Sequence, residues 1–436
     1  MDGSSATAAR AGDDANYLKA ITACGDRRRL VVSQPIYSAT GIKLLDSGAR
    51  LDSRIFERLF GHTLAAPVES CVTSEDALTH RDIAERTRDL VGASPLLTHL
   101  GGKLDQRVAR VWSALAAAPL PPSIALRLTV MRDTAPALYE HSLRAAFVAL
   151  FVGVSLRYVD RDLQVLATAA LLHDAGMQHV NPAHFEAGKP LDVAGRRGLF
   201  AHPLTAQMIV QGEPLLSPAI AEAIAQHHER LDGSGYPKGL TGDAIGKLAR
   251  VLMVVELVLA MLEGEVAQPE LQLSLILRLN HRSFDADVST AVLAALPAVD
   301  VPAGATPCNR SAHDNLVALL NAWRNLRDRN PPRADDAAAV FIDDRTKRLQ
   351  RWLAEAGLGS GSADAARQAA EAAPGVCAEV GALAREALWH LRQIAYDASE
   401  HWPQLAPRNG VEARGAAGQW IAAAFSLDVP RDHETA

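Results

Sequence analysis

Apolar residues in the middle of the chain recur with the period of a helix. From about residue 123 to residue 296 they fall at spacings of three and four, which places them on one side of a helix. One such face consists of Leu138, His141, Ala145, Val148 and Val152. Helices with a continuous apolar face pack against one another around a core. The pattern therefore predicts an all-helical domain, which we bound at residues 106–296.

The segments on either side of this domain have different patterns. Residues 1–29 are mostly small and polar and predict a flexible tail. Residues 30–105 contain LVVSQPIYSATGIKLLDSGARL, a series of short β-like runs separated by glycines, and predict a small β-containing module. Residues 297–436 predict a C-terminal helical region of unknown role. Its helical segments are expected at 316–326, 340–356, 365–373 and 376–395. The predicted fold class is therefore mainly α.

The composition agrees with a folded, mainly helical chain. Of the 436 residues, 48% are hydrophobic, 22% are charged and only 5% are aromatic. The formal net charge of -6 gives no global field that would attract DNA or an anionic membrane. The four cysteines lack CxxC spacing, so they predict neither disulfides nor a thiolate zinc site and fit a cytoplasmic protein. No signal peptide or membrane insertion is predicted, because the longest apolar run, at 251–262, is too short.

Histidines are concentrated in the predicted helical domain. Seven of the fifteen lie between His141 and His228, and helical spacing would bury several of them. His173 extends an apolar stripe and is followed at once by Asp174 and by Gly176, which stops the helix. An imidazole and a carboxylate are therefore expected to meet at one helix end.

Two further segments supply histidines. A helix that begins at a Ser-Pro pair would end with the adjacent His227 and His228 on its inner side. His202 precedes a proline in another helical segment. His179 and His184 lie in the loop after the helix stop, and we do not assign them as ligands.

Glu256 lies in VLMVVELVLAM, with apolar neighbours on every side of the predicted helix. An unpaired buried carboxylate loses several kcal/mol of solvation, so it must be protonated, paired with a cation or bound to a metal. Binding of divalent metals by neutral imidazoles and carboxylates would offset the solvation free energy that all these groups lose on burial. Five histidines and two acids exceed what one ion needs, so two metals are predicted, and the absence of thiolates favours iron or manganese.

Each of these residues alone also has an ordinary structural explanation. A lone His141 or His202 is more often a hydrogen-bonded core histidine than a metal ligand. His173 and Asp174 could form a charge–dipole contact at a helix end, and one of the two adjacent histidines could be exposed. The metal interpretation depends on the joint pattern rather than on any single residue.

The order of these segments resembles that of the HD-GYP family of the HD phosphohydrolase superfamily. The segments that carry the resemblance are LLHDAGM, AHPLTAQMI, AIAQHHERLDGSGYPKGLTGDAI and ARVLMVVELVLAM. The string HHERLDGSGYPKGL is highly specific, and the resemblance covers about residues 130–285. It implies an all-helical domain that hydrolyses cyclic di-GMP to the linear dinucleotide and, in many members, onward to GMP.

The resemblance implies a role for each member of the histidine cluster. The implied metal ligands are His141, His173, Asp174, His202, His227, His228 and Glu256. His173 and Asp174 are also the implied catalytic residues, with Asp174 bridging the two divalent metals. A hydroxide between those metals would attack phosphorus in line. Glu256 stands where the family usually has an aspartate.

The resemblance also implies a substrate-binding loop. The implied substrate-binding residues are Gly235, Tyr236, Pro237, Arg230 and Lys238. In this family the loop is also associated with contacts to diguanylate cyclase (GGDEF) domains, which makes such a domain a candidate partner. Two basic phosphate contacts of the family are absent, because the lysine of its HDxGK signature is Met177 here and an arginine expected after Glu256 is missing. Arg230, Lys238 and Arg250 lie nearby in the sequence and could compensate.

Two functions follow from the resemblance. The first is a metal-dependent phosphodiesterase for cyclic di-GMP, with activity reduced by the missing phosphate contacts. The alternative is a catalytically weak or inactive HD-GYP-like signalling module that binds nucleotide or a diguanylate cyclase partner. The nearly complete ligand set favours the first, and Met177 favours the second.

Overall fold

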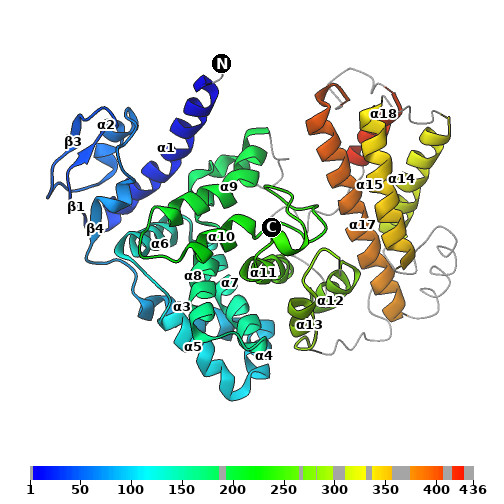
Figure 1. Cartoon of the computed structure of the whole chain (residues 1–436), viewed down its shortest axis with the longest axis horizontal. Coiled ribbons are helices and arrows are strands. Elements are labelled where there is room, and N and C mark those ends of the chain that lie inside the picture. Colours follow the sequence, from blue (N-terminus) through cyan, green and yellow to red (C-terminus); the bar gives the residue numbers. More distant parts are fainter. Residues whose placement is uncertain are drawn as a thin grey trace. The chain divides into compact units, whose positions relative to one another are not determined.

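The protein is described here by a computed structural model. It describes residues 3–185, 193–264, 269–280, 282–297, 310–329, 336–355, 374–405 and 415–426. Helices predominate in these ranges and the strands are short, which confirms the mainly α fold class (Figure 1). The chain divides into two compact units. Unit 1 comprises Met1–Leu259 and His281–Leu296, and unit 2 comprises Ala260–Asn280 and Pro297–Ala436.

The N-terminal segment is a helix, α1 (Gly3–Arg27), so the prediction of a flexible tail over residues 1–29 is wrong. Tyr17, Leu18, Ile21 and Cys24 follow helical spacing and are all buried. This apolar stripe occupies only the second half of the helix, and the small and polar residues before it obscured the pattern in the sequence.

A small β structure follows α1. Strand β1 (Leu30–Val32) pairs antiparallel with β4 (Val72–Ser74), and β2 (Ile36–Tyr37) pairs antiparallel with β3 (Lys43–Leu45). The buried residues of these strands share one core with α1 and with Leu126 and Val130 of α6 (Pro122–Thr134). The strands lie within the range 30–105 of the predicted β-containing module, but no boundary between compact units falls near residue 105.

The described residues of unit 1 contain ten further helices. These helices are α2 (Phe56–Phe60), α3 (His80–Ala93), α4 (Pro95–Lys103), α5 (Val108–Ala116), α7 (Pro136–Ser155), α8 (Asp160–Leu172), α9 (Val193–Gln211), α10 (Pro218–Gln226), α11 (Lys247–Glu263) and α13 (Ala286–Leu293). Helices α7 and α8 pack along each other, and α8 carries Asp160 and Asp162 in its first turn, where negative charge favours the helix dipole. By length and composition α7 is the one described helix that could cross a membrane, yet 72% of its most apolar window is buried.

The end of α8 is fixed by a close approach of two backbones. The 3₁₀ segment η4 (Ala175–His179) follows α8 and packs on α9. A Cβ atom at Gly176 would lie 2.1 Å from the carbonyl oxygen of His202, so only glycine fits without displacement. This contact brings the residues at the end of α8 beside His202.

Unit 2 is helical throughout its described residues. It contains α12 (Pro269–Leu279), α14 (Arg310–Arg329), α15 (Ala337–Glu355), α17 (Pro374–His401) and α18 (Gly415–Ser426). Trp323 and Trp420 lie in its core with their rings edge to face and their centroids 5.7 Å apart. Three of the predicted helical segments correspond to α14, α15 and α17, and the segment predicted at 365–373 lies outside the described residues.

Candidate metal centre

The seven predicted metal ligands come together in unit 1, although they are spread along the sequence. His141 lies on α7, His173 and Asp174 follow α8, His202 lies on α9, His227 and His228 follow α10, and Glu256 lies on α11. Their side chains are buried or nearly so, with His141 and Asp174 the most exposed at 14%. The ligand atoms form two neighbouring groups.

The first group consists of His141, His173 and Glu256, whose ligand atoms all lie within 4.8 Å of one another. Nε2 of His173 is 2.9 Å from Oε1 of Glu256 and 3.2 Å from Nε2 of His141. The glutamate therefore reaches the two imidazoles from α11, although the resemblance led us to expect the shorter aspartate at this position.

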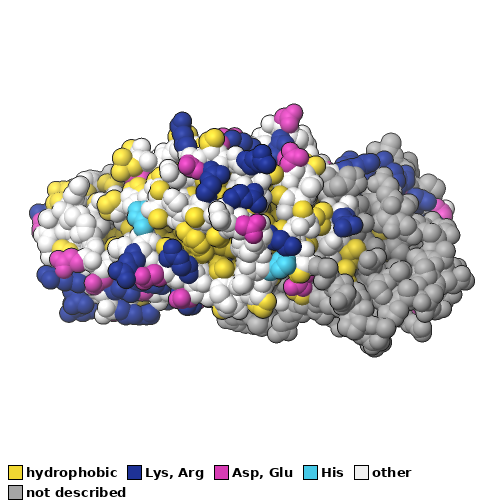
Figure 2. Space-filling model, turned by 90° about the horizontal axis from the view of Figure 1, so that it is seen from below, with side chains coloured by type: hydrophobic (Ala, Val, Ile, Leu, Met, Phe, Trp, Pro, Cys, Tyr) yellow, Lys and Arg dark blue, Asp and Glu magenta, His cyan; other side chains and the backbone are white. Residues whose placement is uncertain are grey.

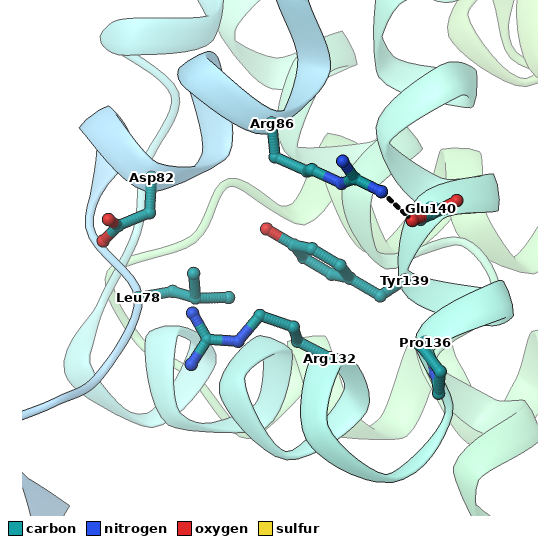
Figure 3. Close-up of a pocket in the computed structure, with 7 residues that line it drawn as sticks. All are labelled: Leu78, Asp82, Arg86, Arg132, Pro136, Tyr139 and Glu140. Carbon is teal, nitrogen blue, oxygen red and sulfur yellow. Dashed lines mark hydrogen bonds and ion pairs between the residues drawn. The ribbon is translucent and has the colours of Figure 1, made fainter. Parts of the chain in front are cut away.

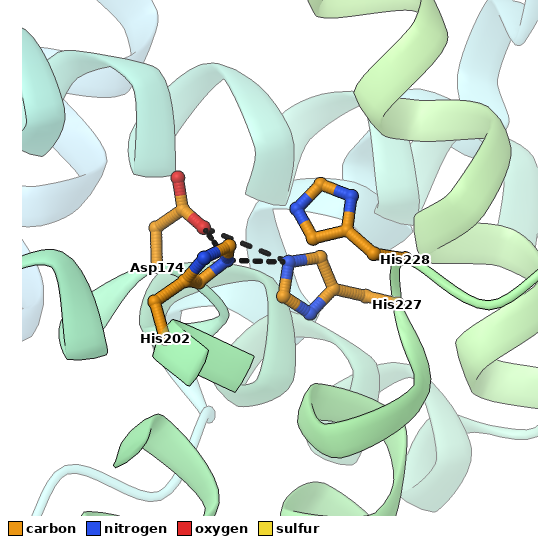
Figure 4. Close-up of side chains that lie close together, drawn as sticks. All are labelled: Asp174, His202, His227 and His228. Carbon is orange, nitrogen blue, oxygen red and sulfur yellow. Dashed lines mark hydrogen bonds and ion pairs between the residues drawn. The ribbon is translucent and has the colours of Figure 1, made fainter. Parts of the chain in front are cut away.

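The second group consists of Asp174, His202, His227 and His228, whose ligand atoms also lie within 4.8 Å of one another. Figure 4 shows the rings of His202 and His227 meeting beside the carboxylate of Asp174. Nε2 of His202 is 3.0 Å from Oδ1 of Asp174 and 3.3 Å from Nε2 of His227. The arrangement offers three imidazoles and one carboxylate oxygen to a single point.

Asp174 connects the two groups. Its Oδ1 faces the second group, at 3.0 Å from His202 and 3.6 Å from His227. Its Oδ2 faces the first group, at 3.6 Å from Nε2 of His173 and 3.7 Å from Nε2 of His141. One oxygen directed to each group is the geometry of a carboxylate that bridges two metal ions.

Three of the imidazoles are oriented by hydrogen bonds to the main chain. Nδ1 of His173, His202 and His227 each donates to the carbonyl oxygen three residues earlier, at 2.8, 2.5 and 2.6 Å. A carbonyl oxygen only accepts, so each Nδ1 carries a proton, and in the neutral form of each ring Nε2 presents its lone pair to the site. Metal-binding histidines are typically held in this way.

This orientation leaves hydrogen-bond acceptors facing one another. Among the described residues, Oδ1 of Asp174 and Oε1 of Glu256 are buried and no hydrogen-bond donor is assigned to either. Lone pairs of neutral imidazoles point toward the same oxygens, which is unfavourable in a desolvated site. A divalent cation in each group would accept both kinds of lone pair. The residues present therefore fit two metal ions.

The pKa shifts distinguish the two groups. Although burial opposes its charge, the imidazoles of His173 and His141 hold the pKa of Glu256 well below its usual value. Against its own burial, the nearby carboxylates raise the pKa of His173, so a proton competes with a cation in the first group. Burial lowers the pKa of His227 and lowers that of His228 further, so both rings stay neutral and ready to bind a metal near pH 7.

The predicted loop borders the second group. The ring of Tyr236 stacks on His228 with 4.6 Å between centroids, and it meets Phe200 of α9 edge to face. A Cβ atom at Gly235 would lie 2.4 Å from the backbone of residues 229–230, so the turn that directs Tyr236 to the site requires glycine. The main-chain N–H of Tyr236 also donates to the carbonyl oxygen of His228 at 3.1 Å.

The predicted basic residues of the loop have other contacts. The guanidinium of Arg230 lies over the ring of Phe284, 4.9 Å from its centroid, and donates to the carbonyl oxygen of Glu229. The side chain of Lys238 is exposed. Their roles as phosphate contacts stay predictions. Met177 is half-buried in η4, and its main-chain N–H donates to the carbonyl oxygen of Asp174 at 2.9 Å.

Glu229 is a residue that the sequence reasoning missed. It is fully buried, and its two carboxylate oxygens accept from the main-chain N–H groups of Lys238 and Leu240, both at 2.8 Å. The residue thus ties the two ends of the loop together beside His228. A charged residue between buried histidines and a glycine-rich loop was the available signal, because a buried carboxylate needs donors and the adjacent loop offers main-chain N–H groups.

Comparisons with known proteins agree with this site. Residues 128–288, which include all seven predicted ligands, match the HD domain family. A 3'3'-cGAMP-specific phosphodiesterase of Vibrio cholerae is 35% identical over 119 residues, which is 27% of this chain and 25% of that protein. A cyclic di-GMP phosphodiesterase response regulator of Xanthomonas campestris is 30% identical over 28% of this chain and 32% of its own length.

A third relative is a cyclic di-GMP phosphodiesterase of Pseudomonas aeruginosa, 30% identical over 132 residues. That match covers 30% of this chain and 31% of the relative. The chain thus matches between a quarter and a third of the length of these three relatives.

Proposed function

We propose that this chain, whose residues 128–288 are an HD domain of the HD-GYP type, is a metal-dependent phosphodiesterase that hydrolyses a cyclic dinucleotide. The observation that carries the proposal is the carboxylate of Asp174, which directs one oxygen to each of two groups of ligands. We take cyclic di-GMP as the substrate and the linear dinucleotide, GMP or both as the product. Two of the three relatives are named for that nucleotide, and the third is named for 3'3'-cGAMP.

Each metal position has its own ligands. His141, His173, Glu256 and Oδ2 of Asp174 would hold one ion. The remaining histidines of the second group, His202, His227 and His228, would hold the other together with Oδ1 of Asp174. Ions at these positions would activate water and neutralise the charge that develops on a phosphoryl group. The absence of thiolates among the ligands favours iron or manganese.

The remaining residues of the site orient these groups. The main-chain hydrogen bonds of His173, His202 and His227 keep each Nε2 directed inward, so no ring has to turn when substrate binds. Tyr236 offers an aromatic surface next to His228, against which a guanine base can stack. Gly235 allows that approach, and Pro237, Arg230 and Lys238 complete the proposed substrate-binding loop.

The location and the protein partner belong to the same proposal. We assign the chain to the cytoplasm, where cyclic di-GMP is made, and we take a diguanylate cyclase (GGDEF) domain as the partner of the loop at 232–237. The burial of α7 supports the first assignment, because its apolar face is used within unit 1.

Metal analysis and turnover of the purified full chain test the proposal. Protein prepared without chelator under reducing conditions should contain two iron or manganese ions per chain and should hydrolyse cyclic di-GMP; 3'3'-cGAMP serves as the competing substrate. The change Asp174→Asn removes one of the two bridging oxygens, so it should reduce metal content and lower turnover by about 10²-fold or more.

The matched control is Asp160→Asn, because Asp160 is an exposed carboxylate that pairs with Arg110. It should retain metal content and activity. Two bound metals without turnover of either nucleotide would contradict the enzymatic function and favour the signalling module. Protein without metal would contradict the metal centre itself.

A further inference from the structure

A second site lies outside the metal centre. A cavity of about 260 Å³, open to solvent on one side, lies between α3, α6, α7 and the residues just before α3 (Figure 3). Its walls are formed by Leu78, Asp82, Arg86, Arg132, Pro136, Tyr139 and Glu140. None of the predicted metal ligands lines it. Tyr139 and His141 are two residues apart on α7, a rotation of about 200° along a helix, so they face opposite sides.

Two hydrogen-bond donors in this cavity have no acceptor within the described part of the chain. Tyr139 is 3% exposed, and among the described residues its hydroxyl oxygen has no hydrogen-bond partner. The same is true of Nη2 of Arg132, although Nε of that guanidinium donates to Asp133. Figure 3 shows the Tyr139 hydroxyl and the Arg132 guanidinium both directed toward the side of the cavity at Leu78. Buried donors without acceptors are rare in folded proteins.

The acidic side chains of the cavity are already engaged. Oδ2 of Asp82 accepts from the main-chain N–H and the hydroxyl of Thr79, in the capping box of α3. Glu140 accepts from Arg86 and from Arg144, the latter at 3.2 Å. Both carboxylates therefore already accept hydrogen bonds, whereas the hydroxyl of Tyr139 and Nη2 of Arg132 have no acceptor among the described residues. Burial also raises the pKa of Tyr139 to about 12, so its hydroxyl keeps the proton that it would donate.

We propose that this cavity binds a small monocarboxylate, whose oxygens accept hydrogen bonds from Tyr139 and Arg132 and whose apolar body contacts Leu78 and Pro136. Carboxylate oxygens accept from a hydroxyl and from a guanidinium N–H, and both of these donors point to the same side of the cavity. A dianionic phosphate fits less well, because Asp82 and Glu140 line the same cavity and Arg86 is held by Glu140. The volume suits a body of the size of an aromatic ring.

Binding of named probes to the full chain tests this site. Acetate, butyrate and benzoate would be titrated by calorimetry, with benzyl alcohol as the neutral counterpart of benzoate and inorganic phosphate as the anion control. Benzoate should bind at one saturable site and raise the melting temperature, and benzyl alcohol and phosphate should do neither. Tyr139→Phe and Arg132→Gln should each weaken benzoate binding by about tenfold or more.

Tyr139→Phe keeps the ring and removes only the unpartnered hydroxyl, so without a probe it should be as stable as the parent chain or more stable. The control Arg81→Gln changes an arginine on the same helix α3 that pairs with Glu85 at the surface, and it should leave binding unchanged. Failure of all three carboxylates to saturate would overturn the proposal. Benzoate binding that survives both cavity substitutions would place the ligand elsewhere, at the metal centre for example, and would overturn it equally.

Discussion

At the scale of single residues, the loop and the histidine rings are held in position by groups that bind neither metal nor substrate. Glu229 accepts two main-chain hydrogen bonds from the loop, and three carbonyl oxygens hold the histidine rings. These contacts decide which atoms face the centre before any ion or nucleotide arrives. Substitutions of such residues should therefore change how well the site is formed rather than which ligands it contains.

Glu229→Gln tests the anchoring of the loop. A glutamine presents one NH₂ group where the carboxylate presented an oxygen, so a donor faces the N–H of Lys238 or Leu240. We expect a loss of about 2 kcal/mol of folding stability and a rise in KM for the cyclic dinucleotide larger than any fall in kcat. The measurements are urea unfolding and steady-state kinetics. Glu222→Gln, on the neighbouring α10, is the control, and an unchanged KM for Glu229→Gln would contradict the anchoring role.

Met177→Lys tests the missing phosphate contact. A lysine in η4 would supply the charge that the HD-GYP signature has at this position, and we expect kcat/KM to rise about tenfold, mainly through KM. The same change at Met208, which is 56% exposed on α9, is the control for added charge alone. No gain from Met177→Lys would mean that phosphate binding does not limit this centre.

At the scale of elements, η4 connects the metal centre with the N-terminal structure. Arg127 of α6 is 1% exposed and pairs with Glu69, and its guanidinium lies 3.8 Å from the ring centroid of Tyr17 on α1. It also contacts Gln178 and His179 of η4, at 3.4 and 3.3 Å. A single buried cation thus holds α1, the segment before β4 and the segment that follows Asp174.

Glu69→Gln tests this buried ion pair. Removing one partner takes away the carboxylate that pairs with the buried charge of Arg127, and we expect a loss of about 3 kcal/mol or more in the free energy of unfolding. Glu69→Gln combined with Arg127→Met should be less destabilised than Glu69→Gln alone, because the second change removes the buried charge. Urea unfolding measures both, and Arg81→Gln, at an exposed pair, should stay within about 0.5 kcal/mol of the parent. Equal losses for the single and double variants would argue against a buried charge as the cause.

At the scale of the whole molecule, the features to which we assign a function lie in unit 1. Unit 1 contains the β structure, the metal centre and the cavity. Unit 2 is a set of packed helices, and of its residues only Ala260–Asn280 fall within the range 128–288 that matches the HD domain family. Figure 2 shows basic and acidic side chains interspersed over the described part of the face drawn, which agrees with the modest net charge.

The ion pair between Arg28, directly after α1, and Asp133 of α6 should weaken in acid. Although burial opposes the charge, hydrogen bonds from Arg28 and Arg132 hold the pKa of Asp133 below its usual value. A lowered pKa means that this carboxylate stabilises the fold above its unfolded pKa of about 3.9 and that the contribution is lost as pH falls below that value. Asp133→Asn should cost about 1 kcal/mol at pH 7 and should flatten the acid limb of the stability curve. An acid limb identical to that of the parent chain would contradict this.

The sequence predicted the chemistry of the centre better than its surroundings. Histidines and a glutamate at apolar helix positions need partners, so His141 and Glu256 could be grouped from spacing and burial alone. The helix α1 could not be predicted, because its apolar stripe begins only near Tyr17. The role of Glu229 could not be predicted, because its hydrogen-bond partners are main-chain groups of a loop. The cavity could not be predicted either, because donors without acceptors are recognised only once α3, α6 and α7 are placed together.

The close approaches at Gly176 and Gly235 have a consequence for how sequence variation is tolerated. Neither residue is among those with positive φ, so the constraint is one of space and begins with the first added carbon. At most positions the damage done by a substitution grows with the size of the new side chain. At these two positions, alanine should be almost as harmful as tryptophan. In a saturation-mutagenesis profile of the domain, the loss of stability at Gly176 and Gly235 would therefore be large for every substitution instead of increasing with side-chain size. Such a profile needs no activity assay, and it would identify Gly176 and Gly235 as the positions near the metal centre where two main-chain segments are in direct contact.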